Sequence, residues 1–72
     1  MRFTDEEITA AFITYLDHVN NGGSINISSI RALFLQKLGY GFQKTGAMMR
    51  ILQDEDNQQD FLRMHPEYKH NL

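Results

Sequence analysis

The sequence predicts an all-α fold, a small bundle of three to four helices. Apolar residues recur at intervals of three and four over residues 5–19, 27–38 and 42–53, which is the spacing of amphipathic helices. Clusters of glycine and asparagine separate these stretches and are typical of helix ends and turns. At 72 residues the chain has room for one domain, and its 42% hydrophobic content is enough for a small core.

Composition excludes several kinds of protein. The chain has no cysteine, which rules out disulfides and thiolate metal sites. Its first residues lack the apolar core of a signal peptide, and no apolar run approaches the ~18 residues of a membrane span. We therefore expect a soluble, cytoplasmic protein with no membrane partner. The formal net charge of −2 argues against indiscriminate binding of polyanions but not against a local basic face.

The first helix begins at a capping box. Thr4 and Glu7 have the S/T-x-x-E spacing in which each side chain bonds the backbone amide of the other residue. Phe3 and Ile8 have the spacing of a hydrophobic staple. The buried stripe of this helix is expected to contain Ile8, Phe12, Tyr15, Leu16 and Val19.

A break at residues 20–23 (NNGG) leads into the second helix. Residues 24–27 alternate polar and apolar, which suits either a very short strand or two isoleucines inserted into the core. The helix starts with Asn26 or Ser28 as its cap and stops at Gly39. Its apolar face is expected to contain Ile27, Ile30, Phe34, Leu35 and Leu38, with Leu33 at the edge.

The third helix is predicted to present Ala47, Met48, Ile51 and Leu52 to the core. The acids at residues 54–56 suit the start of a short fourth helix, with Asn57 and Asp60 as a cap pair and Phe61, Leu62 and Met64 packed on the core. A small β-hairpin, a vestigial wing, is the alternative, and the helix is favoured. Residues 1–65 then form the single helical domain and residues 66–72 a C-terminal tail.

One stretch of the chain is basic and free of acids. No Asp or Glu lies between His18 and Gln53, and all nine acids lie outside that interval. The same interval holds four cations, Arg31, Lys37, Lys44 and Arg50. Two helices joined by a tight turn in an acid-free segment form the outline of a helix-turn-helix, for which DNA is the first partner to consider.

The candidate binding residues follow from that outline. Side chains near the start of the second helix of such a motif contact base edges in the major groove; here they are Gln43, Lys44 and Thr45, with Arg50 one to two turns later. Gln suits adenine and Arg suits guanine. Lys44, Lys37 and Arg31 are candidates for phosphate contacts. The exposed stripe of this helix is predicted to be Gln43, Gly46, Arg50 and Gln53.

Gly46 leaves two alternatives open. A glycine inside a helix costs about 1 kcal/mol relative to alanine, so it usually has a packing reason. On the exposed stripe it lets a sugar-phosphate backbone or a partner helix approach closely. With the register shifted by one residue, it instead lets the second and third helices pack closely. A protein partner or a second copy, docked on this stripe together with Met49, is therefore the alternative to DNA.

The order helix, short extended piece, helix, turn, helix resembles winged-helix and trihelical DNA-binding domains. Residues 27–30, 38–40 and 48–52 follow that pattern. Residues 41–49 (GFQKTGAMM) are similar to the turn and recognition helix of the gamma domain of bacterial chromosome-segregation translocases. The resemblance covers residues 8–53 and implies a small DNA-binding regulator of transcription, of the kind that phages and mobile elements encode. It departs from the pattern at Thr45, where an aliphatic side chain is expected.

The first half of the chain also resembles an EF-hand. The capped helix, the NNGG loop and Ile25 follow its order, and Gly23 aligns with the loop glycine. That alignment puts His18 at the first ligand position and Ser29 at the twelfth, where calcium needs carboxylates. Calcium binding is therefore not expected.

No pattern in the sequence indicates catalysis. The chain has no nucleophile elbow and no glycine-rich phosphate loop. His18, His65 and His70 share no helical pairing, so no metal site is expected. We expect a protein that is not an enzyme, has no cofactor and binds no small-molecule substrate.

Overall fold

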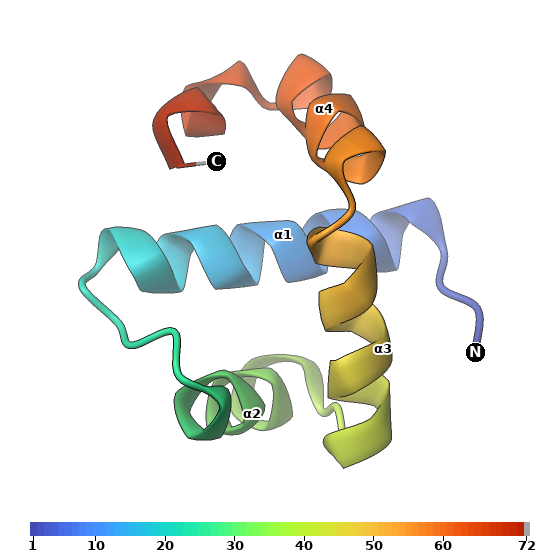
Figure 1. The fold of residues 1–72 in the computed structure, drawn as a ribbon, viewed down its shortest axis with the longest axis vertical. Helices are drawn as coiled ribbons and strands as arrows, with labels where there is room; N and C mark the ends of the chain where they lie inside the picture. Colours follow the sequence, from blue (N-terminus) through green and yellow to red (C-terminus); the bar gives the residue numbers. More distant parts are fainter. Residues whose placement is uncertain (72) are drawn as a thin grey trace.

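The computed structural model describes residues 1–71, which fold into five helical elements without a strand. They are α1 (Asp5–Asn20), α2 (Ile27–Leu38), α3 (Phe42–Leu52), α4 (Glu55–Met64) and the 3₁₀ helix η1 (Pro66–Asn71). α1 crosses the middle of the molecule, with α2 on one side and α4 on the other, and α3 runs crosswise from beside α2 to α1 (Figure 1). The all-α prediction is confirmed.

α1 starts at the predicted capping box. The Glu7 amide donates to the Thr4 hydroxyl at 3.1 Å, and the Thr4 amide donates to the Glu7 carboxylate at 2.9 Å. These bonds satisfy two amides that have no partner within the helix. The bond from the Thr4 amide is the main reason that the pKa of Glu7 lies below its usual range, and nearby Lys44 adds to the effect.

α2 is delimited by Asn26 and Gly39. The Asn26 side chain accepts the Ser29 amide at 2.9 Å, which identifies Asn26 as the cap. Gly39 ends the helix with φ of 71°, a left-handed conformation that glycine adopts without strain. The segment before the cap is irregular rather than a strand, and Ile25 is 65% exposed rather than inserted into the core.

The fourth helix forms as predicted, but its cap differs. Asp54 caps it by accepting the Asn57 amide at 3.2 Å. Asn57, predicted as a cap, instead donates its side-chain amide to the Ile51 carbonyl at 3.1 Å and so ties α4 to the end of α3. No wing forms in residues 1–71, because this segment completes a helix. Met64 is 78% exposed, so the expectation that it packs on the core was wrong.

Residues 66–71 form a 3₁₀ helix against the body of the protein, which differs from the expected tail; Leu72 lies outside the described residues. The Tyr68 hydroxyl donates to the Asp17 carboxylate at 2.8 Å, and its ring lies 5.6 Å from that of Phe61. The bond to Asp17 is the main reason that the pKa of Tyr68 is raised. Tyr68 therefore holds this segment to α1 through its hydroxyl and to α4 through its ring.

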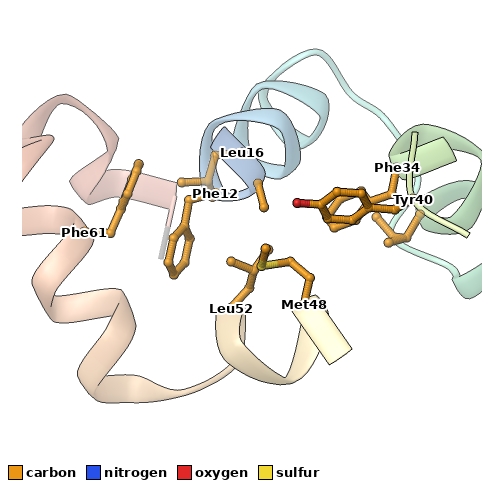
Figure 2. Close-up of a cluster of buried hydrophobic side chains, with 9 residues drawn as sticks. Phe12, Leu16, Phe34, Tyr40, Met48, Leu52 and Phe61 are labelled. Carbon is orange, nitrogen blue, oxygen red and sulfur yellow. The ribbon is translucent and has the colours of Figure 1, made fainter. Parts of the chain in front are cut away.

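The core lies where α1 meets the other helices (Figure 2). Phe12 and Leu16 of α1 face Met48 and Leu52 of α3. The ring of Phe12 stacks on Phe61 of α4 at 4.6 Å between centroids. In the described part of the chain, the buried apolar residues are Ala11, Phe12, Leu16, Ile30, Phe34, Tyr40, Met48, Leu52 and Phe61.

None of the helices in residues 1–71 combines the length and the apolar character needed to cross a bilayer.

The molecule is flattened, with extents of 29 × 29 × 17 Å. A helix with its side chains is about 10–12 Å across, so the thin dimension of the molecule accommodates only about two packed helices. Much of α2 and α3 is consequently left in contact with solvent.

Candidate functional site

The outer face of α3 is the stripe that the sequence predicted. Gln43, Gly46, Arg50 and Gln53 are all exposed. A Cβ placed on Gly46 would have nothing within 4 Å, so this glycine faces open space. The alternative in which Gly46 lets α2 and α3 pack closely is therefore wrong. We call these four residues the α3 stripe.

Thr45 does not belong to that surface. It is 2% exposed, and its hydroxyl has no hydrogen-bond partner. Successive residues of a helix point about 100° apart, so the turn that exposes Gly46 buries Thr45. The expectation that Thr45 contacts a ligand is corrected: it fills the position where the helix-turn-helix pattern expects an aliphatic residue.

Lys44 is engaged within the protein. Its ammonium group lies 4.5 Å from the centre of the Tyr40 ring and 4.0 Å from the Glu7 carboxylate of α1. These are a cation–π contact and a partly exposed ion pair, each of modest strength. The side chain thus helps join α3 to α1, and its charge is partly balanced before any ligand arrives.

The other three basic residues of the acid-free segment lie in different surroundings. The Arg31 guanidinium lies over the Phe42 ring, 3.9 Å from its centre. Lys37 lines a different hollow that it shares with Asp17 and His18 of α1. Arg50 is on the α3 stripe. The acid-free run of sequence is therefore not free of acids in space, because Glu7 of α1 lies beside Lys44 and Asp17 of α1 lines the same hollow as Lys37.

A hollow of about 250 Å³ lies between the outer side of α2 and the start of α3. Two large apolar side chains border it while exposed to solvent, Leu35 at 62% and Phe42 at 67%. We call it the α2–α3 hollow. Its lining consists of Arg31, Ala32, Leu35, Tyr40, Gly41, Phe42 and Thr45.

Sequence reasoning missed this hollow because it assigned Leu35 to the core. Leu35 follows Phe34 directly, so it points about 100° away from that buried residue. Ile27 is likewise 57% exposed, since it is the first residue of α2. Taking Ile30 and Phe34 alone as the core positions would have placed Leu35 outside and identified an apolar residue without a partner.

The EF-hand-like loop is held by a histidine. The His18 ring bonds the Ser24 carbonyl at 2.8 Å and lies so close to Gly23 that a Cβ there would meet the ring at 2.2 Å. Among the side chains that the structure describes, no three or more His, Cys, Asp or Glu residues are arranged to hold a metal ion.

No protein-family model, curated protein or solved structure matches this chain. The function is therefore argued from the geometry described above, in which an apolar hollow and a polar helix stripe lie on the same pair of helices.

Proposed function

We propose that the chain is a non-catalytic protein-interaction module whose α2–α3 hollow docks a partner protein. The observation that carries the proposal is the exposure of Leu35 and Phe42 on either side of an apolar hollow. Large apolar side chains grouped on the surface around a concavity are typical of sites that a partner covers. The α3 stripe, with half-buried Met49 at its edge, extends this surface with groups suited to a polar rim.

The distribution of charge favours a protein over DNA. Duplex DNA is bound mainly through cations placed along its phosphates. Here Lys44 lies beside Glu7, and Lys37 shares its hollow with Asp17. Arg50 is left as the cation on the α3 stripe.

The proposal is tested by affinity capture with variants. Immobilised wild-type protein and a Leu35→Ser variant are exposed to lysate of the native host, with Met64→Ser as a control that alters another exposed apolar residue, on α4. We expect a captured protein that Met64→Ser retains and Leu35→Ser loses. Equal capture by all three proteins contradicts docking at the hollow. Gly46→Leu, which adds bulk to open space, reports whether the partner also covers the α3 stripe.

DNA binding is the second candidate, and the α3 stripe supports it. Gln43, Arg50 and Gln53 are exposed on α3. If α2 and α3 act as a helix-turn-helix, α3 is its second helix, and side chains on such a helix contact bases. Fluorescence anisotropy with random-sequence duplex DNA at low and moderate salt separates the candidates. Binding that falls steeply with salt favours DNA; base preference would then change in Gln43→Ala, and binding to all sequences would weaken in Lys44→Ala. An absence of binding at low salt favours the protein partner.

A further inference from the structure

The α2–α3 hollow has the size of a single side chain. Its volume of about 250 Å³ lies below the ~300–1,000 Å³ of pockets that hold drug-sized molecules. Its lining is almost entirely apolar, and Arg31 is the one charged residue among those that line it. A bulky aliphatic or aromatic side chain is the group that such a space accepts, in the manner of an interface anchor.

Arg31 gives the rim of the hollow a positive charge. Its guanidinium lies over the Phe42 ring, 3.9 Å from the centre, and a guanidinium carries several N–H donors with which it can bind a carboxylate. None of the described ion pairs uses Arg31. Every residue of the lining comes from the part of the chain without acids, so nothing there competes for this charge.

We infer that the occupant of the hollow is a bulky apolar side chain from an acidic segment of a partner protein, with a neighbouring Asp or Glu bound by Arg31. The inference rests on the proposed docking function and adds the chemistry of the partner. The apolar anchor supplies most of the affinity, and the carboxylate selects the segment, because a basic segment would bring a like charge to Arg31.

The inference is tested by selecting random linear peptides displayed on phage against the full chain. Parallel selections use Leu35→Glu, which places a carboxylate on the rim, and Arg31→Gln, which removes the charge. The matched control is Lys37→Gln, since Lys37 is also an exposed cation of α2 but does not line this hollow. All three altered side chains are exposed, and circular dichroism checks that each variant folds.

We expect the wild-type and Lys37→Gln selections to converge on peptides with a bulky apolar residue next to Asp or Glu. Synthetic copies of these peptides should bind Arg31→Gln about tenfold more weakly, the scale of a lost charged contact at an interface. The Arg31→Gln selection should keep the apolar residue and lose the acids. Binding to Leu35→Glu should be lost.

Other results overturn the inference and separate it from the proposed function. The charge selection is refuted if the selected peptides are rich in Lys or Arg, or if acidic peptides bind Arg31→Gln as tightly as wild type. Docking at the hollow still stands in either case if Leu35→Glu abolishes binding. Peptides that bind Leu35→Glu as well as wild type contradict both. A wild-type selection that converges on nothing refutes this inference, and affinity capture then tests docking separately. A dimer of the wild-type chain that Leu35→Glu dissociates identifies a second copy as the occupant and also refutes it.

Discussion

Replacing Thr45 with valine should stabilise the protein. Valine has the shape of threonine with a methyl group in place of the hydroxyl, so the packing around a 2%-exposed residue is preserved. The hydroxyl at this site is buried without a hydrogen-bond partner. A buried polar group left unpaired costs about 1–3 kcal/mol, and the helix propensities of the two residues are nearly equal.

We therefore expect Thr45→Val to raise the free energy of unfolding by about 1–2 kcal/mol, measured by urea denaturation followed by circular dichroism. The corresponding rise in Tm is about 4–8 °C per kcal/mol for a domain of this size. Thr14→Val on α1 is the control, since Thr14 is half-buried on a hollow open to water and should change little. Thr45→Val with wild-type stability would show that the hydroxyl finds a partner in solution, the Gly41 carbonyl one turn earlier being the nearest in sequence.

Three further outcomes follow from local backbone and side-chain geometry. Gly46→Ala should gain about 1 kcal/mol in the same denaturation, because the added Cβ meets nothing and alanine favours the helix; no gain would contradict the open position. Gly39→Ala should lose about 1 kcal/mol, because φ is 71° there, and an unchanged midpoint would refute that strain. Burial raises the pKa of Tyr40 and the bond to Asp17 raises that of Tyr68, so the folded state holds both phenolic protons more tightly than the unfolded state. The contribution of these two tyrosines to the stability of the fold is complete below the unfolded pKa of 10.0. It is lost as the pH rises through the raised pKa values of the folded state. In thermal scans, Tyr68→Phe should make the fall of Tm with rising alkaline pH less steep. An unchanged dependence of Tm on pH would count against the hydrogen bond to Asp17.

The helices could be predicted from the sequence because their ends carry local chemistry. Thr4 and Glu7, Asn26 and Gly39 act within a few residues of their own positions, and all four mark the helix boundaries as expected. Asn57 was misassigned because its partner, the Ile51 carbonyl, belongs to the preceding helix. A side chain that bonds across a junction resembles a cap in sequence, and only the packing of the two helices distinguishes the cases.

The candidate site was predicted less completely, because its contacts too lie between helices rather than within one helix. The exposure of Gln43 and Arg50 follows from the helical period alone and was predicted, whereas the position of Gly46 was left open between two registers. That Lys44 lies beside Glu7 depends on how α3 crosses α1, which no local pattern encodes. Counting charges along the chain therefore could not show that an acid of α1 pairs with Lys44.

The hydrogen bond from Tyr68 to Asp17 joins residues 51 apart in the sequence. Helices form from local contacts, but this bond and the stacking of Phe12 on Phe61 need both ends of the chain. During synthesis the side of α1 that faces α4 therefore stays uncovered until α4 and η1 have been made and have packed against it. For the experiments above, an affinity tag before Met1, which is 74% exposed, keeps the added bulk away from η1 and its contacts with α1.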